Sequence, residues 1–519
     1  MKQFIYLFFL FVTNQVTAQH YDLVLRNGRI VDGTGNAWYR ADVAIKDGKI
    51  AKIGTAITKS KQIIDVEDKI ISPGFIDVHT HVETSLPEIP TADNFIHDGV
   101  TTLLTGNCGS SEVDLSAFFS KIETLGISVN VGSLIGHNDV RQAVMKDAMR
   151  TPTNEEQEKM EALVTKAMKD GAFGFSTGLI YVPGTYAKTD EVVNLARAAA
   201  ALGGIYVSHI RSEGSKVKEA IEEAIQVGRE AKMPVQISHF KISSKPLWGR
   251  SHETIAIVET ARQEGIDVTI DQYPYTASST NLGTMLPSWA LAEGDSAIHL
   301  RLNDTTIRAK IRKEMLENLT ADHRTNFDYA VVARYSPDTT FQGKSITEIN
   351  RFLGRNETAE QEADLIMDML DKGFAQMIFH KMSEEDVQFI LRYPFTMIAS
   401  DAGIYALNKS IPHPRGYGSN ARVSGRYVRD YQSLKLEDAI RRMTSLPAAR
   451  FGLKDRGLVQ EGYAADLVIF DEKTIEDQAT FEQPHAYAKG IERVLVNGKI
   501  VLENGKHTGS RAGKVLRKE

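Results

Sequence analysis

Short apolar runs alternate with amphipathic stretches along most of the chain. The runs have the length and composition of buried strands and lie at residues 74–81, 101–109, 128–137, 171–179, 204–210, 234–240, 267–275 and 395–401. Between them, Thr153 and Glu156 form a capping box that opens a helix. The alternation predicts an α/β fold, a closed (β/α)8 TIM-like barrel over residues 73–455. A doubly wound open sheet is the alternative architecture.

Both ends of the chain show a different pattern, in which apolar and polar residues alternate strictly around tight turns. Asn27-Gly28, Asp32-Gly33 and Asp47-Gly48 are typical of β-hairpin turns. The segments 24–31 (VLRNGRIV) and 494–501 (VLVNGKIV) have nearly identical sequences. We therefore expect residues 19–72 and 456–519 to form one small composite β-sandwich, with the barrel between its two halves.

Residues from about 284 to about 390 interrupt the alternation of strands and helices. They contain a helical stretch around residues 307–323 and a Gly-containing stretch at 341–354. A segment of this length is too long for a loop without structure of its own. We expect a small insertion between barrel strands seven and eight, near the barrel mouth.

Residues 1–18 have the layout of a secretory signal peptide. Lys2 precedes an apolar stretch from Phe4 to Val12, and small residues around Ala18 match a cleavage site. No other apolar run reaches the ~20 residues that a membrane span needs. The mature protein is expected to be exported, either periplasmic or secreted, without a membrane span.

The charge pattern indicates small molecules rather than nucleic acids as partners. The net charge is -6 over 519 residues, and no basic stripe accompanies it. No feature of the sequence indicates the oligomeric state.

Cys108 is the only cysteine in the chain and lies at the end of the second apolar run. A single cysteine cannot form an intrachain disulfide. It could be a small buried apolar residue, a nucleophile or a metal ligand.

Polar residues with metal-binding side chains end several of the predicted strands. Active sites of such barrels lie at the carboxyl ends of the strands. Imidazole, thiolate and carboxylate are the ligands of zinc, and three protein ligands with one open position are typical of a catalytic site. The candidate ligands are His79, His81, Cys108, His209, His239 and Asp401. His137 ends the third strand in the same way, and its position fits packing and substrate contact equally well.

Seven short motifs give the sequence a resemblance to a known family. Together they extend from about residue 21 to 505, and the motifs are GFIDVHTH, GVTTLLTGNCG, SHIRSEG, VQISHFK, MIASDAG, HPRGYG and GYAADLVIFD. The chain resembles the amidohydrolase superfamily, in particular its D-aminoacylase (N-acyl-D-amino-acid deacylase) branch. The HxH and GxxADLV elements occur throughout the superfamily, whereas the motif around Cys108 and the HPRGYG segment are much narrower.

The resemblance implies a zinc centre. Cys108, His209 and His239 match the ligands of one tightly bound zinc ion. His79, His81 and Asp401 match a second site that is weakly occupied or empty, and Cys108 can reach both. Many relatives outside this branch carry a bridging lysine or glutamate on strand four, where this chain reads GAFGFSTGL. The Cys108 thiolate would take that place.

The resemblance also implies the reaction and the substrate contacts. The activity is zinc-dependent hydrolysis of the amide bond of an N-acyl-D-amino acid, with Asp401 as general base and acid. Cations and hydrogen-bond donors would hold the substrate carboxylate. The matching positions are Lys241, Arg415, Tyr181, Tyr273, and Ser278 or Ser279. We expect Arg211 and Glu213 to pair with each other and to brace strand five.

Three other functions fit parts of the pattern. One is a dipeptidase for substrates that contain a D-amino acid, and another is a cyclic amidase similar to dihydroorotase or hydantoinase. The absent strand-four lysine and the presence of Cys108 argue against the cyclic amidase. An exported binding protein that had lost catalysis would lack metal ligands, whereas this sequence has all of them.

Overall fold

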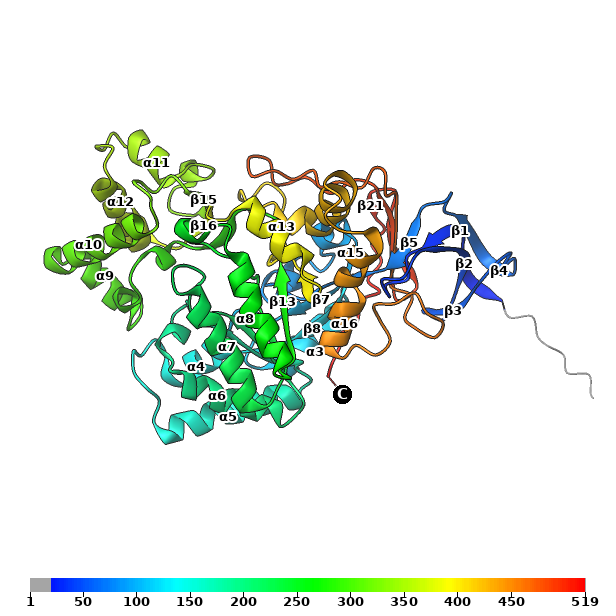
Figure 1. Cartoon of the computed structure of the whole chain (residues 1–519), viewed down its shortest axis with the longest axis horizontal. Helices are drawn as coiled ribbons and strands as arrows, with labels where there is room; N and C mark the ends of the chain where they lie inside the picture. Colours follow the sequence, from blue (N-terminus) through cyan, green and yellow to red (C-terminus); the bar gives the residue numbers. More distant parts are fainter. Residues whose placement is uncertain (1–19, 519) are drawn as a thin grey trace, which may run out of the picture.

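The computed structural model describes residues 20–518. The predicted signal peptide, residues 1–18, lies outside this range. A central barrel lies between two smaller parts, a sheet made from both ends of the chain and an insertion (Figure 1).

The barrel is closed and contains the eight predicted strands. The segments form seven parallel pairs, and β8 and β9 are two parts of one bent strand. The first and last strands are joined by a bridge between Thr80 and Ala402 and by the bond from Asp401 N to His79 O (2.9 Å). This closure excludes the doubly wound sheet. The strands are β6 (Phe75–Asp77), β7 (Val100–Thr105), β8 (Asn130–Ser133), β9 (Ile135–Gly136), β10 (Gly174–Gly178), β11 (Ile205–His209), β12 (Val235–Ile237), β13 (Val268–Gln272) and β17 (Thr396–Ile398).

Helices cover the outside of the barrel between successive strands. The predicted capping box is present, because the Thr153 side chain accepts from Glu156 N and the Glu156 side chain accepts from Thr153 N. The helices are α1 (Ser85–Glu88), α2 (Asp93–Ile96), α3 (Leu115–Leu125), α4 (His137–Met145), α5 (Asn154–Lys169), α6 (Thr189–Ala200), α7 (Val217–Ala231), α8 (Ser251–Gln263), α13 (Glu384–Arg392), α14 (Arg415–Arg422), α15 (Leu436–Met443) and α16 (Ser445–Phe451). A π-helical stretch, Val423–Asp430, continues α14.

The barrel interior changes from apolar to polar toward the carboxyl ends of its strands. On β11, Ile205 and Val207 belong to the interior apolar cluster, and His209 lies on the same face two residues later. After β17, Ala399 and Asp401 repeat this arrangement. The alternation of strand side chains therefore brings polar residues together above the interior apolar cluster.

The end of the chain closes the opposite side of the barrel. Leu516 N donates to Val131 O (2.7 Å), and Lys518 N donates to Gly171 O (3.0 Å). The Leu516 side chain packs against the interior apolar cluster. Residues 513–518 thus contact the barrel, which differs from the expected placement of all of 456–519 in the terminal domain.

Strands from both termini form one continuous nine-stranded sheet, as the similar terminal segments predict. Its order is β21-β20-β19-β18-β5-β1-β2-β3, with β4 paired to β1. A bridge between Lys49 and Ala464 joins the far hairpin to the segment before β18, so the sheet curls around its own apolar cluster. The strands are β1 (Tyr21–Ile30), β2 (Tyr39–Lys46), β3 (Lys49–Gly54), β4 (Ser60–Asp65), β5 (Ile70–Pro73), β18 (Leu467–Phe470), β19 (Ile491–Val496), β20 (Lys499–Glu503) and β21 (Lys506–His507).

The insertion lies between β13 and β17, as predicted, and has a core of its own. It begins at Ser278, earlier than expected, and α13 already belongs to the barrel because it packs on α8. Its three-stranded sheet has the order β14-β16-β15. The elements are β14 (Ser278–Asn281), α9 (Asp295–Asn303), α10 (Thr305–Ala321), β15 (Ala330–Tyr335), α11 (Ile346–Phe352), α12 (Ala359–Lys372), β16 (Ala375–Phe379) and short 3-10 turns.

A buried ion pair joins the terminal sheet to the barrel and provides a stability test. Asp466 pairs with buried Arg456 and accepts from Asn130 Nδ2 of β8 (3.0 Å). Asp466→Ala leaves the buried Arg456 guanidinium with only the exposed carboxylate of Asp455 at 3.6 Å, and we expect it to lower the free energy of unfolding by about 3–5 kcal/mol. Chemical denaturation would measure the loss. Glu155→Ala, which removes an exposed pair with Lys159, should leave the free energy of unfolding nearly unchanged.

Candidate metal centre

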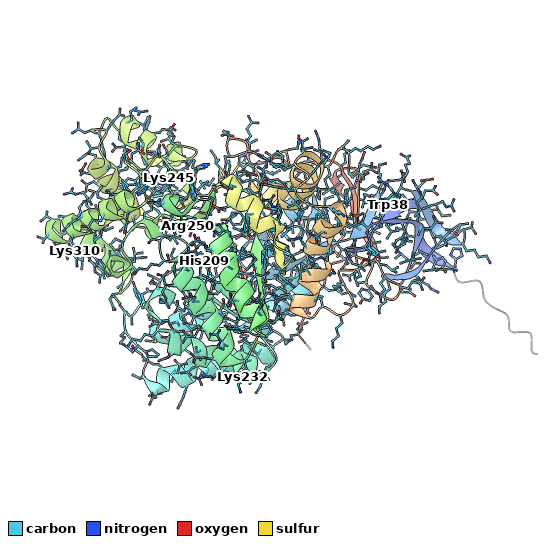
Figure 2. The ribbon with its side chains drawn as sticks, in the orientation of Figure 1. Trp38, His209, Lys232, Lys245, Arg250 and Lys310 are labelled. Carbon is cyan, nitrogen blue, oxygen red and sulfur yellow. The ribbon has the colours of Figure 1, made fainter. Side chains whose placement is uncertain are left out.

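All six predicted metal ligands converge at the carboxyl end of the barrel. Cys108 Sγ lies 3.2 Å from His79 Nε2, 3.5 Å from His209 Nδ1 and 3.6 Å from His239 Nε2. The last two ring nitrogens are 2.7 Å apart. In Figure 2, His209 lies toward the insertion, and Lys232, which precedes β12, lies at the far edge of the barrel.

These side chains fit two adjacent metal positions. One is formed by Cys108, His209 and His239, whose ligand atoms lie within 4.8 Å of one another. The other is formed by His79 with either His81 and Cys108 or His239 and Asp401. A thiolate with two imidazoles is a zinc donor set, and three ligands leave one position open. The residues present therefore fit zinc.

The Cys108 thiol has the charge state that a metal ligand requires. Burial alone would raise its pKa, but the charges of His79 and His239 and hydrogen bonds from both His209 and His239 outweigh this effect. The pKa of Cys108 therefore falls well below 9.0. Cys108 is 6% exposed, so solvent oxidants have little access to the thiolate.

Backbone strain accompanies three of the six candidate ligands. Cys108, His239 and Asp401 adopt positive φ angles of 53°, 35° and 52°, a region that residues other than glycine rarely occupy. Such strain is typical of functional sites, where surrounding structure fixes the backbone. Here it turns each ligand from the end of its strand toward the shared centre.

Asp271 of β13 orients two of the histidines and is a residue that the sequence analysis missed. Its side chain contacts His79 Nδ1 at 3.2 Å and accepts from His239 N (2.8 Å) and Gln236 Nε2 (2.6 Å). A carboxylate on Nδ1 directs Nε2 of His79 toward Cys108. The only signal in the sequence is an acidic residue inside an apolar strand.

Glu213 belongs to the metal centre, which corrects the predicted Arg211–Glu213 pair. Arg211 pairs instead with Glu223 of α7 through two bonds of 2.9 Å. Glu213 lies 3.0 Å from His239 Nδ1 and forms an ion pair with Lys241. Burial opposes its ionisation, but Lys241 and His239 outweigh burial and lower the pKa of Glu213. Glu213 is thus a charged partner behind a metal ligand.

A cavity of about 760 Å³ opens above the metal centre. Its floor contains His81, Cys108 and Asp401, and its walls come from the barrel loops and the insertion. The wall includes Asn138, Tyr181, Ser279, Thr280, Arg334, Phe374, Gln376 and Arg415.

The predicted substrate-binding residues divide into two groups. Tyr181, Ser279 and Arg415 line the cavity. Lys241, Tyr273 and Ser278 lie outside its lining. Both cations nevertheless stand over the Tyr273 ring, with Arg415 Cζ at 4.4 Å and Lys241 Nζ at 5.6 Å from its centre. Tyr273, which is 1% exposed, therefore supports the two cations from below.

Arg415 links Asp401 to the cavity. Its Nη1 lies 2.8 Å from Asp401 Oδ2, and its Nε has no hydrogen-bond acceptor within residues 20–518 although it is buried. Burial raises the pKa of Asp401, but Arg415 and His79 outweigh burial and hold this pKa well below 3.8. Asp401 is therefore ionised, and Arg415 keeps donors for a second anion.

Tyr181 presents a free phenolic proton to the cavity. Thr280 Oγ1 donates to its hydroxyl oxygen at 3.0 Å, which leaves the Tyr181 proton for another acceptor. Burial and the charge of Cys108 raise the pKa of Tyr181 well above 10.0, so the proton stays in place. The rings of Tyr181 and His209 also pack at an angle of 62°, with their centres 4.8 Å apart.

His137 has a packing role. It is fully buried at the start of α4, and its Nε2 lies 3.0 Å from Glu191 Oε1, which also accepts from Arg141 Nε. His137 is outside the cavity lining. Of the two roles left open for it, the structure supports packing.

The family profile that matches this chain describes the amidohydrolases. It matches residues 62–278 and 375–502. The unmatched stretch between them coincides with most of the insertion. The conserved framework is therefore the barrel and part of the terminal sheet.

Individual relatives match over nearly the whole length. D-aminoacylase from Alcaligenes xylosoxydans xylosoxydans is 35% identical over 97% of this chain and 99% of its own. A solved D-aminoacylase with a binuclear metal centre, 35% identical, has a TM-score of 0.81 and covers 96% and 100% of the two chains. N-acyl-D-glutamate deacylase from Bordetella bronchiseptica, solved with zinc and a phosphonate inhibitor, is 33% identical with a TM-score of 0.82 and the same coverage.

The role of Glu213 can be tested through metal affinity. Glu213→Gln replaces the charge behind His239 with a neutral amide, and we expect zinc to bind about 10- to 100-fold more weakly. Competition with a chelator would measure the change. Glu223→Gln removes a carboxylate that pairs with Arg211 instead, and zinc affinity should be unchanged. Equal affinities of the Glu213 variant and the wild type would contradict the assigned role.

Proposed function

The chain belongs to the amidohydrolase family, in its D-aminoacylase branch, and on this premise we propose that it hydrolyses the amide bond of N-acyl-D-amino acids. The products are a carboxylic acid and a free D-amino acid. The observation that carries the proposal is the convergence of a complete zinc donor set, an ionised carboxylate and an arginine at the floor of one cavity.

The side chains divide the reaction between them. Zinc held by Cys108, His209 and His239 would supply a Lewis acid for the amide carbonyl and would lower the pKa of water. Asp401 accepts the proton of the attacking water, whose oxygen adds to the carbonyl carbon. As the C–N bond breaks, Asp401 returns this proton to the departing amine nitrogen. An alternative role for Asp401 is that of a ligand alone.

The residues around Asp401 would bind and orient the substrate. The guanidinium of Arg415, which lines the cavity, provides a donor for the substrate carboxylate. The phenolic proton of Tyr181 provides a second donor to a substrate oxygen. We propose supporting roles for Ser279 at the cavity wall and for Lys241, Tyr273 and Ser278 behind it.

For the metal content, we propose one tightly bound zinc ion at Cys108, His209 and His239 and a weaker second site at His79, His81 and Asp401. Cys108 can serve both positions because its Sγ is within 3.6 Å of ring nitrogens from both groups. The solved D-aminoacylase with a binuclear centre is consistent with two positions.

The alternatives differ in how well the site suits them. A cyclic amidase is disfavoured because β10, Gly174–Gly178, carries neither a lysine nor a glutamate. A dipeptidase for D-containing substrates remains the second candidate, since an N-acyl-D-amino acid and such a dipeptide differ only at the acyl end.

We further propose that the protein is exported. The support is the layout of residues 1–18, with a cation, an apolar stretch and a small-residue cleavage site. No helix within residues 20–518 is long and apolar enough to cross a membrane.

The proposed reaction is tested with matched N-acetyl-D- and N-acetyl-L-amino acids and with D-containing dipeptides. We expect higher kcat/KM for the N-acetyl-D series, and activity on the L series alone would refute the stereochemical assignment. Asp401→Asn should remove turnover and keep the tight zinc, measured by metal analysis. Cys108→Ala should lose both, and full zinc occupancy in that variant would refute its role as a ligand.

We also propose that Arg334 favours substrates with an acidic side chain. A bulge in β15 at Ala333 places both residues at the cavity wall, opposite Gln376 of β16. Arg334 Cζ lies 5.7 Å from the centre of the Phe374 ring, and Arg334 has no carboxylate partner within the described part of the chain. It is therefore a free cation at the cavity, and one relative acts on an N-acyl-D-glutamate.

Removal of this cation should alter selectivity rather than catalysis. For Arg334→Ala we expect kcat/KM for N-acetyl-D-glutamate to fall about tenfold, with little change for N-acetyl-D-leucine. Arg351→Ala removes an exposed arginine of the insertion that pairs with Glu357 and should change neither value. A parallel fall for both substrates would contradict a role in selectivity.

A further inference from the structure

Tyr181 reaches the cavity from the turn that follows β10. Tyr181 N donates to Gly178 O (3.0 Å), and Thr185 N donates to Tyr181 O (2.8 Å). The phenol itself is held at its far end by Thr280. The position of the Tyr181 hydroxyl therefore depends on the backbone of this turn.

One buried side chain, that of Asn138, fixes the turn at both ends. Asn138 Nδ2 donates to Gly178 O (3.1 Å) and to Tyr181 O (3.4 Å). Its Oδ1 accepts from Gly178 N (3.3 Å). The amide thus uses both of its donor hydrogens and an acceptor position on a single turn, and Asn138 is only 7% exposed.

The backbone of Asn138 is bonded to the metal-ligand turn. Asn138 N donates to Gly109 O (2.9 Å), and Gly109 follows Cys108 directly. The two turns also touch, because a Cβ on Gly178 would lie 2.0 Å from Cys108 O. Asn138 therefore connects the ligand Cys108 with Tyr181.

The amide has no room to adopt another position. A Cβ on Gly109 would lie 2.2 Å from Asn138 Oδ1, and one on Gly184 would lie 2.5 Å from it. Gly109 also has a φ of +76°, which favours glycine. These glycines enclose the amide closely, so its hydrogen bonds are held in one geometry.

We propose that Asn138 is a positioning residue that sets the place of the Tyr181 hydroxyl relative to the metal centre. The inference rests on the proposed function, in which this hydroxyl donates to the substrate. Asn138 acts through Tyr181, so its contribution should vanish when the hydroxyl is absent. A direct substrate contact, which its place in the cavity wall would also permit, should persist without that hydroxyl.

A double-mutant cycle separates these possibilities. We expect Asn138→Ala to lower kcat/KM about 10- to 100-fold, because misplacement by about 1 Å has effects of that size, with zinc content unchanged. In a Tyr181→Phe background the same change should cost less than about twofold. An equal loss in both backgrounds, or a loss of zinc that parallels the loss of activity, would overturn the proposal.

Asn138→Asp extends the test with a side chain of the same size. Its carboxylate cannot donate to Gly178 O or Tyr181 O, so it should behave as the alanine variant does. If the alanine variant does not fold, the aspartate variant replaces it in the double-mutant cycle with Tyr181→Phe. A crystal structure of either variant should show the Tyr181 hydroxyl displaced from Thr280 Oγ1, and wild-type kcat/KM in the aspartate variant would overturn the inference.

Asn130→Ala is the matched control. Asn130 is also buried and donates to Thr101 O (3.0 Å), but it lies at the start of β8, away from the cavity. We expect lower stability with wild-type kcat/KM, and a fall equal to that of the Asn138 variant would overturn the specific role. Wild-type enzyme without turnover of any N-acyl-D-amino acid would refute the proposed function instead, and the displacement of Tyr181 could still be measured by crystallography.

Discussion

The rest of the site depends on a buried thiolate that is surrounded by imidazoles. Cys108 reaches three histidines because its backbone turns into the left-handed region at the end of β7. The same turn places Cys108 O against Gly178, so a side chain at that end of strand four would collide with it. The turn that carries the Cys108 thiolate therefore leaves no room for a side chain at position 178 of strand four. The glycine-containing strand four and the single cysteine are two parts of one arrangement.

The ligands were predictable because each one ends an apolar run, and strand periodicity brings such residues together in a barrel. The acidic residues that support these ligands, Asp271 and Glu213, were not predictable from the sequence. Asp271 contacts His79, which is 192 positions away in the chain, and no local sequence pattern predicts that contact. The predicted pairing of Glu213 with Arg211 rests on their closeness in sequence, whereas the fold brings Arg211 to Glu223 and Glu213 to His239. Sequence proximity predicted the wrong partner for Glu213, because the tertiary fold determines which charged groups meet.

The insertion was predictable as a break in the βα rhythm, but its share in the cavity was not. Its strands carry Arg334 and Gln376 into the wall, and a bulge at Ala333 determines which side chains face inward. A bulge of one residue reverses the faces of a strand and leaves no clear pattern in the sequence. The family profile does not match residues 279–374, so Arg334 lies outside the matched framework, whereas Gln376 and the six candidate metal ligands lie within it.

The charges of the site are arranged so that the metal centre and the substrate do not compete for them. Asp271 and Glu213 lie behind the histidines, where their negative charge supports the ring nitrogens that face the metal. Arg415 lies on the cavity side, and Asp401 occupies only one part of its guanidinium. Burial strengthens both sets of interactions because little water screens them. In the proposed reaction, an incoming carboxylate would meet a guanidinium that Asp401 already holds in place.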